Sequence, residues 1–181
     1  MYRGLEQDPA DRLPCAAGLS SDCIALSGMS KTFALPGLRI GWLVCRDQAI
    51  RGKLIQLKDY TTICASAPSE VLAIIALQNR ERILARNLAI ITRNIRLVNE
   101  FVGRNADKVS WSAPKAGSVA LLNLLHSFSA ENFCQELLEK KEVLAIGSHL
   151  FNYLKPSIRL GLGRIGFTEA LERLEEMVRG S

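Results

Sequence analysis

Residues 27–42 read SGMSKTFALPGLRIGW, and this stretch decides how the chain is interpreted. It places one lysine, Lys31, in a segment rich in Gly, Ser and Pro between two short apolar stretches. Ser27 and Ser30 precede the lysine, and Arg39 follows it by eight residues. The pattern predicts a loop between two strands, with an amine, two hydroxyls and a guanidinium near one another along the chain.

These four groups favour a particular chemistry. A lysine that lies near a cation and away from bulk water loses its proton more readily, and a neutral amine attacks a carbonyl to form a Schiff base. Hydroxyls, backbone amides and a guanidinium suit a phosphate dianion. Pyridoxal 5′-phosphate (PLP) is an aldehyde that carries a phosphate, so it would engage all of these groups. The alternative is an ordinary surface loop with a solvated lysine.

The whole segment resembles the lysine motif of the class I/II aminotransferases, the fold-type-I PLP-dependent enzymes. In that family the lysine forms a Schiff base with PLP, and an arginine eight residues later binds the cofactor phosphate. The resemblance assigns these roles to Lys31 and Arg39. It assigns phosphate contacts to Ser27 and Ser30, although Gly28 stands where many relatives have serine.

Three further segments are similar to the same family in order and spacing. Residues 2–6 (YRGLE) resemble a segment whose tyrosine hydrogen-bonds the phenolic oxygen of PLP, a role that falls on Tyr2. Residues 60–70 (YTTICASAPSE) resemble the segment that lines the mouth of the active site near the dimer interface. Residues 157–163 (SIRLGLG) resemble a strand whose arginine binds the α-carboxylate of the substrate, a role that falls on Arg159.

The residues alone leave other interpretations open. Tyr2 could be a frayed terminal residue, and Arg159 could pair with a structural carboxylate such as Glu172. The arginines of residues 80–103 could bind an anion or a nucleic acid, but they lack the interleaved aromatic residues of single-strand binders. We therefore expect these arginines to form a solvated helix face.

Hydrophobic spacing predicts the remaining elements. Residues 22–26 and 39–45 are strand candidates, and we expect the second of these to be buried on both faces. Asp47 is the expected N-cap of a helix that runs to about residue 59, and residues 69–79 predict a buried helix. A long helix over residues 80–103 carries one apolar stripe, formed by Leu84, Leu88, Ile91, Ile95, Val98 and Val102.

The second half of the chain alternates strands and helices. The pattern predicts strands at residues 109–111, 119–125, 143–146 and 157–162. It predicts helices from Ser129 to about residue 141 and over residues 167–179. The expected fold class is α/β followed by α+β. By resemblance, residues 1–80 are the C-terminal part of a PLP-binding large domain with an incomplete mixed sheet, and residues 81–181 are a bridging helix and a small domain.

Composition restricts the other functional classes. The chain has 181 residues, 48% of them hydrophobic and 23% charged, as in an ordinary globular protein. No apolar run is long enough to cross a bilayer and no secretory signal is visible, so we expect a cytoplasmic protein without a membrane partner. Five widely spaced cysteines predict reduced thiols, and two histidines, His126 and His149, make a histidine-built metal site an unsupported reading.

The resemblance covers only the later part of a family member. The family segment before the tyrosine carries an aspartate that pairs with the pyridine nitrogen of PLP, and here only Met1 precedes Tyr2. The aromatic ring that stacks on the cofactor, a glycine-rich phosphate turn and an asparagine near the phenolic oxygen also belong to the earlier region. We therefore expect the isolated chain to be a weak catalyst or none. It could be a truncated reading frame, a fragment or one half of a split protein.

The resemblance implies an aminotransferase that acts on an amino acid and a 2-keto acid, with a homodimer or a missing N-terminal half as its protein partner. The alternative is a catalytically inactive truncated domain that serves as a dimerisation or partner-binding module. We expect no nucleic acid partner and no metal.

Overall fold

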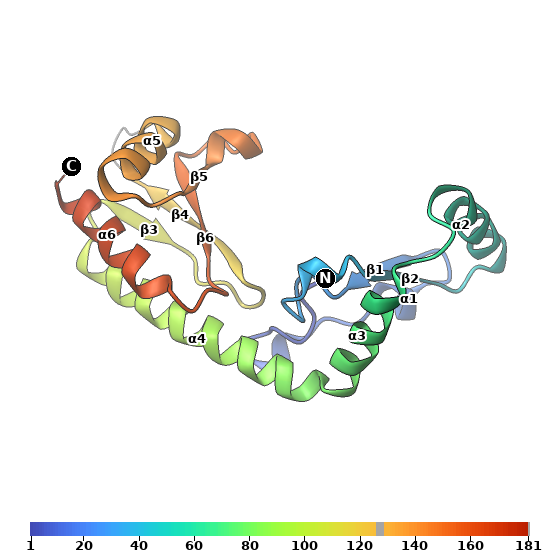
Figure 1. Cartoon of the computed structure of the whole chain (residues 1–181). Helices are drawn as coiled ribbons and strands as arrows, with labels where there is room; N and C mark the ends of the chain where they lie inside the picture. The colour runs from blue at the N-terminus through green and yellow to red at the C-terminus, as the bar shows by residue number, and fades with distance from the viewer. Residues whose placement is uncertain (126–128, 181) are drawn as a thin grey trace. The chain divides into compact units, whose positions relative to one another are not determined.

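A computed structural model describes residues 1–125 and 129–180 (Figure 1). The chain divides into two compact units, Met1–Leu88 and Ala89–Ser181. The division falls within the long helix α4 (Arg80–Arg104), so this one helix contributes residues to both units. Among the described residues, no helix combines the length and the apolar character needed to cross a membrane.

The first unit is built on a two-stranded antiparallel sheet (Figure 1). Strands β1 (Ile24–Gly28) and β2 (Gly41–Cys45) pair in register and are joined by the loop of residues 29–40. Asp47 caps the next helix as predicted, because its Oδ1 accepts from Ile50 N at 2.8 Å. The other elements are η1 (Pro9–Asp11), α1 (Ala16–Leu19), η2 (Pro36–Leu38), α2 (Gln48–Thr61) and α3 (Ala67–Gln78).

A small apolar core fixes the loop between β1 and β2. Met29 and Phe33 from the loop pack against Ala73 and Ala76 of α3. Ala73 and Ala76 are three residues apart and so lie on one face of α3. The loop is therefore anchored on either side of Lys31. The partly buried residues around this core are Leu35, Leu38, Ile40, Trp42 and Ile83.

Two burial predictions for this unit are wrong. Strand β2 is exposed or half-buried along its length, because its only partner strand in the described chain is β1. Helix α3 buries only Ala73 and Ala76. An apolar run predicts burial only where other elements cover it, and here they cover one side. The exposed residues of α3 are Val71, Leu72, Ile74, Ile75 and Leu77.

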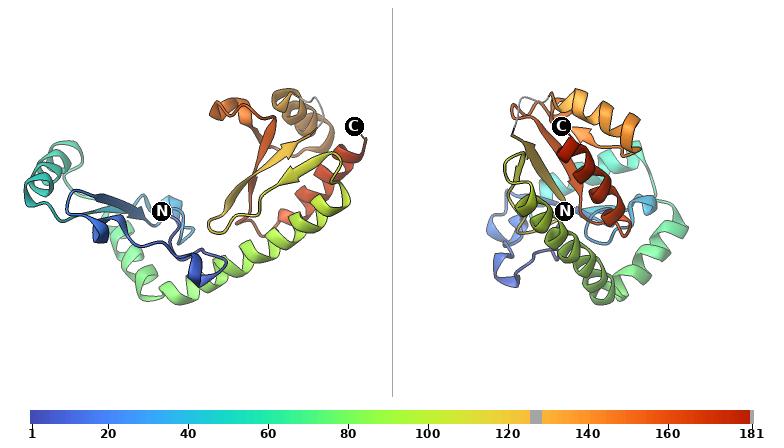
Figure 2. Two further views of the ribbon diagram at one scale, coloured as in Figure 1. Left: turned by 180° about the vertical axis from the view of Figure 1, so that it is seen from behind. Right: turned by 90° about the vertical axis from the view of Figure 1, so that its left-hand side faces the viewer.

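The second unit is an antiparallel sheet covered by helices on one face (Figure 2). Its strand order is β3-β4-β6-β5, formed by β3 (Val109–Trp111), β4 (Val119–Leu124), β6 (Ser157–Gly161) and β5 (Ile146–Gly147). Ser129 caps α5 (Ala130–Lys141) as predicted, with Oγ accepting from Asn132 N. The helices α5 and α6 (Phe167–Gly180) follow the predicted ranges closely, and η3 (Ser148–Phe151) is an added turn.

The apolar stripes of α4 and α6 form the core of this unit. Of the predicted stripe in this half of α4, Ile91 and Val98 are buried and Ile95 and Val102 are half-buried; Phe101, which was not in the predicted stripe, is also buried. The strand predicted at residues 143–146 is wrong in its position, since β5 begins at Ile146. Residues 143–145 instead lead from α5 to the sheet edge. The buried residues of α6 are Phe167, Leu171, Leu174, Met177 and Val178.

Two glycines let β1 and β2 approach closely where the loop begins. Gly28 and Gly41 are cross-strand partners. A Cβ atom on Gly28 would lie 2.9 Å from the carbonyl oxygen of Ile40 and 3.0 Å from the Cα of Gly41. Both neighbours are backbone atoms, so the strands would have to separate to admit a side chain.

We expect Gly28→Ala to destabilise the first unit by about 1–3 kcal/mol, the usual cost of forcing atoms into a packed site. Gly37→Ala is the matched control, because nothing lies within 4 Å of the Cβ it would add. Urea unfolding followed by Trp42 fluorescence in a Trp111→Phe background measures both. Equal unfolding midpoints for the two variants would contradict the close approach.

Glu175 of α6 is the centre of an ion-pair cluster in the second unit. It accepts from Arg104 Nη2 at 2.6 Å, from Arg179 Nη2 at 2.7 Å and from Asn105 Nδ2 at 3.0 Å. The hydrogen bonds from Arg104, with smaller contributions from Asn105 and Arg179, lower the pKa of Glu175 to about 2 from its ordinary 4.5. The carboxylate therefore stabilises the folded state wherever it is ionised.

Because the folded-state pKa is depressed, this stabilisation is complete above about pH 5 and is lost as the pH falls towards 2. We expect Glu175→Gln to reduce the free energy of unfolding at pH 7 by about 2 kcal/mol and to flatten its pH dependence between 5 and 2. Glu172→Gln on the same helix is the control, since Glu172 forms no ion pair with any described residue. Parallel pH profiles for wild type and Glu175→Gln would exclude this role.

Candidate active site

The loop of residues 29–40 brings three of the predicted phosphate and lysine residues to one end of the β1–β2 hairpin. Met29 N donates to Ile40 O at 3.0 Å, so Ser30 and Arg39 leave the hairpin from adjacent positions. Lys31 follows Ser30 directly, and its carbonyl accepts from Ala34 N at 3.1 Å. The hairpin thereby gathers an amine, a hydroxyl and a guanidinium on one loop.

Ser27 lies within β1, where it pairs with Trp42. Within the described chain, the side chains of Ser27, Ser30 and Lys31 form no hydrogen bond or ion pair. The two hydroxyls and the amine are therefore available to bind a ligand. Two hydroxyls, one amine and one guanidinium are the kinds of group that hold a phosphorylated aldehyde, so the donor set fits PLP.

Arg39 has an unusual backbone conformation. Its φ of 54° lies in the left-handed region, which few residues other than glycine adopt. The guanidinium Nη1 donates to Pro36 O at 2.9 Å, and the side chain remains exposed. Ala34 of the same loop also has a positive φ, of 56°.

Lys31 is exposed to solvent in this chain. The sequence led us to expect a lysine shielded from bulk water, and the described residues do not provide that shield. Met29 and Phe33, on either side of Lys31 in the sequence, are buried in the core, whereas Lys31 between them is exposed.

Tyr2 is held in place and does not fray. Its carbonyl accepts from Leu5 N at 3.0 Å, which closes a turn with Gly4 at a φ of 96°. Both carboxylate oxygens of Glu6 accept from Gly4 N, at 2.9 and 3.0 Å. These hydrogen bonds, with those from Arg12, lower the pKa of Glu6 against the opposing effect of its burial, which is the largest single contribution. The turn is therefore well ordered, and Tyr2 is half-buried.

Thr32 links this turn to the lysine loop, and the sequence did not single it out. Its hydroxyl lies 2.6 Å from Met1 O and 3.1 Å from Arg3 O, the two carbonyls that flank Tyr2. Its own carbonyl accepts from Asn87 Nδ2 at 3.0 Å. Asn87 could have been noticed earlier, because it is a polar residue on the apolar face of α4, between Leu84 and Leu88 in the sequence.

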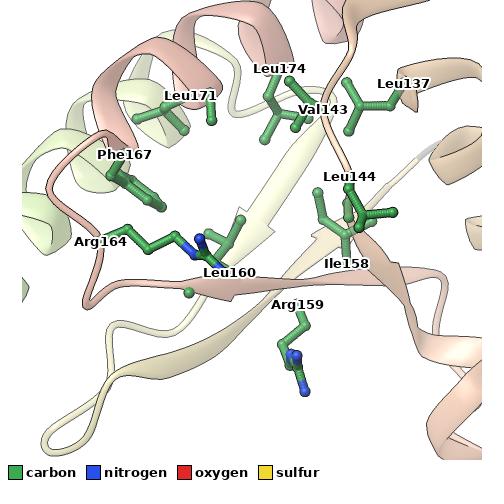
Figure 3. Close-up of a pocket in the computed structure, with 13 residues that line it drawn as sticks. Leu137, Val143, Leu144, Ile158, Arg159, Leu160, Arg164, Phe167, Leu171 and Leu174 are labelled. Carbon is green, nitrogen blue, oxygen red and sulfur yellow. The ribbon is translucent and has the colours of Figure 1, made fainter. Parts of the chain in front are cut away.

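Arg159 belongs to β6 in the second unit. It pairs with Leu121 on one side and Ile146 on the other. Figure 3 shows its side chain on the opposite side of the strand from Leu171 and Leu174, away from the face that the helices cover. It is exposed, and its guanidinium lies 5.6 Å from the centre of the Phe151 ring. No ion pair joins Arg159 to Glu172 or to another described carboxylate.

Buried polar residues fix the strand that carries Arg159. Ser157 Oγ donates to Asn123 Oδ1 at 2.9 Å, and Ser157 N donates to Ser148 Oγ at 3.1 Å. Beyond the other end, Asn94 Nδ2 donates to Leu162 O and to Arg164 O, both at 2.8 Å. Asn94 is fully buried. Arg159 thus projects from a strand that is held at both ends.

The helix-covered side of β6 also borders an apolar pocket of about 120 Å³ (Figure 3). It lies among α5, α6 and the segment of residues 143–145. Arg164 lies at this pocket, whereas the guanidinium of Arg159 points away from its leucines (Figure 3). The pocket is therefore distinct from the face on which Arg159 is available.

The sequence predicts no metal site, partly because the chain has only two histidines, His126 and His149. His126 lies outside the described residues. Across residues 1–125 and 129–180, no group of three or more His, Cys, Asp or Glu side chains is arranged to hold a metal ion. All five cysteines are free thiols, and burial raises the pKa of Cys134.

A family model matches residues 1–178, and its family is described as aminotransferase class I and II. The chain belongs to the class I and II aminotransferases. Aminotransferases of known structure in this family have the fold type I architecture, and the chain matches them over its length. The family and its solved members imply pyridoxal phosphate as the cofactor.

Several relatives illustrate the match. A PLP-dependent aminotransferase from Streptococcus suis 89-1591 is 29% identical with a TM-score of 0.87, over 93% of this chain and 45% of that one. Capreomycidine synthase from Streptomyces vinaceus is 26% identical over 71% of this chain and 33% of its own length. The L-aspartate:5-guanidino-3-methyl-2-oxopentanoate transaminase of Pseudomonas syringae pv. syringae is 28% identical over 76% and 34%. The chain thus spans less than half the length of each.

Proposed function

We propose that this chain carries the lysine and phosphate-binding part of a PLP-dependent aminotransferase site, for an amino acid and a 2-keto acid. One observation supports the proposal most strongly. Ser30, Lys31 and Arg39 extend from one end of a hairpin that is anchored in the core, and neither the Ser30 hydroxyl nor the Lys31 amine is used by another residue of the described chain. Residues 1–80 would belong to the PLP-binding domain and residues 81–181 to the bridging helix and small domain.

Each residue has a defined task in this proposal. Lys31 would hold the aldehyde group of PLP through its Nζ, and Ser27, Ser30 and Arg39 would hold its phosphate. When bound, PLP supplies an electron-accepting ring that stabilises negative charge on the Cα of the substrate. With the substrate amine in its place on the cofactor, the Lys31 amine would be free to take the proton from that Cα as a general base. The phenol hydroxyl of Tyr2 would donate a hydrogen bond to the ring oxygen of the cofactor. Arg159 would bind the α-carboxylate of the substrate.

Full activity requires more protein surface than this chain provides. Lys31 is open to solvent, and water must be excluded for the charged groups of such a site to act strongly. We propose that the shield comes from a second copy of the chain in a homodimer or from a polypeptide that supplies the N-terminal half of the fold.

The second candidate is a non-catalytic module that binds a partner or dimerises. The exposed apolar residues of α3 and of the β1–β2 sheet favour it, because soluble monomers rarely expose so many together. On the sheet, Leu26 and Leu43 are paired across the strands and both face solvent. This candidate predicts association without a covalent bond to PLP.

Reaction with PLP separates the two candidates. We expect the protein to develop a visible absorption band with PLP, and borohydride reduction to leave one cofactor on Lys31, located by peptide mass spectrometry. Lys31→Ala should abolish the adduct, whereas Lys53→Ala, which removes an exposed lysine of α2, should retain it. Labelling that spreads equally over several lysines, or none at saturating PLP, would favour the non-catalytic module.

The phosphate role of Arg39 has its own test. We expect Arg39→Gln to weaken PLP binding about tenfold to a hundredfold, because a charged hydrogen bond contributes roughly 1.5–3 kcal/mol. Binding of pyridoxal, which has no phosphate, should be unchanged. Arg46→Gln is the control, since Arg46 is also exposed and follows β2 directly. An equal loss for both ligands would show that Arg39 shapes the loop and does not bind phosphate. Dissociation constants from absorption titrations provide the comparison.

A further inference from the structure

Thr32 occupies a junction of three segments of the first unit. It is 5% exposed and follows Lys31 directly. Its single hydroxyl proton is shared between Met1 O at 2.6 Å and Arg3 O at 3.1 Å. The N-terminal turn, the lysine loop and α4 therefore meet at one residue, because Asn87 of α4 donates to the Thr32 carbonyl.

The junction leaves little freedom to the residues beside it. Asn87 is 6% exposed, and its Oδ1 accepts from Arg86 Nη1 at 3.1 Å, so its amide is held from both ends. A buried carbonyl that loses its donor costs more free energy than the hydrogen bond itself gained. Phe33 anchors the next position in the core with α3. The backbone directly after Lys31 is consequently fixed by side-chain and main-chain contacts alike.

The two residues that flank this junction act on neighbouring atoms in the proposed function. In PLP the aldehyde carbon and the phenolic oxygen are substituents of adjacent ring carbons. Lys31 is assigned to the first and Tyr2 to the second. Their separation must therefore be set within a fraction of an ångström, and residues that hold reacting groups act by such positioning.

We propose that Thr32 is a positioning residue that couples Tyr2 to Lys31 through its hydroxyl, an inference that rests on the proposed function. The Thr32 hydroxyl hydrogen-bonds to the carbonyls of Met1 and Arg3, the residues before and after Tyr2. The backbone of Thr32 is bonded directly to that of Lys31. The position of Tyr2 is thereby coupled to the position of Lys31. A residue with the same shape and no hydroxyl would keep the loop anchored on Met29 and Phe33 but release the turn.

Thr32→Val is the variant that removes the hydroxyl at nearly constant shape, and Thr32→Ser is the variant that retains it. Thr62→Val, at an exposed threonine after α2, controls for the substitution itself. We expect Thr32→Val to accelerate amide hydrogen exchange at Leu5 about tenfold and to weaken covalent PLP binding at Lys31 about tenfold. Thr32→Ser should stay within about twofold of wild type in both.

A second readout distinguishes positioning from simple structural support. The pH midpoint of the visible band of PLP-loaded protein reports on protonation of the nitrogen that joins Lys31 to the cofactor, and a hydrogen bond from Tyr2 to the ring oxygen would shift that midpoint. We expect Thr32→Val and Tyr2→Phe each to shift this midpoint, and the double variant to shift it no further than Tyr2→Phe alone. Additive shifts would mean that Thr32 acts independently of Tyr2 and would overturn the proposal.

The remaining outcomes are equally decisive. If wild type forms no adduct on Lys31, the proposed function itself fails and the role of Thr32 with it. If wild type forms the adduct and Thr32→Val binds PLP with an unchanged affinity and pH midpoint, only the role of Thr32 is overturned. If Thr32→Ser behaves as Thr32→Val does, the hydroxyl is not the cause.

Discussion

A buried hydroxyl must find an acceptor, and the acceptors that Thr32 finds determine how the first unit is assembled. In the same N-terminal segment, Leu5 and Glu6 are also buried. The carbonyl of Thr32 extends the same constraint to α4 through Asn87. Thr32 is therefore held by hydrogen bonds through both its side chain and its backbone. The Lys31 amine beside it forms no hydrogen bond or ion pair with the described residues.

The second unit follows the same rule with different residues. Ser157 and Asn94 hold the segment that carries Arg159 from its two ends, and both are fully buried. Phe151 lies against the guanidinium and limits the positions that it can take. Lys31 in the first unit and Arg159 in the second are exposed, charged side chains, and buried polar residues hold the backbone beside each of them. This combination allows a binding group to be accessible and still be pre-organised.

The sequence predicts the local structure well and its surroundings poorly. Asp47 and Ser129 cap helices as expected, because capping depends on a few neighbouring atoms. The 69–79 segment forms the expected helix, but its apolar side chains are largely exposed, since periodicity carries no information about what covers a face. The lysine motif identified the family because it combines many residues at fixed spacing. Thr32 and Asn87 escaped notice because their importance arises from contacts 29 to 55 residues apart.

The apolar side chains that α3 and the β1–β2 sheet leave in water affect how solutions of the chain behave. Attraction between such surfaces is entropic near room temperature and strengthens on warming. We therefore expect association of molecules through these surfaces to strengthen as the solution is warmed. Sulfate, which strengthens apolar association, and urea, which weakens it, should shift this association in opposite directions.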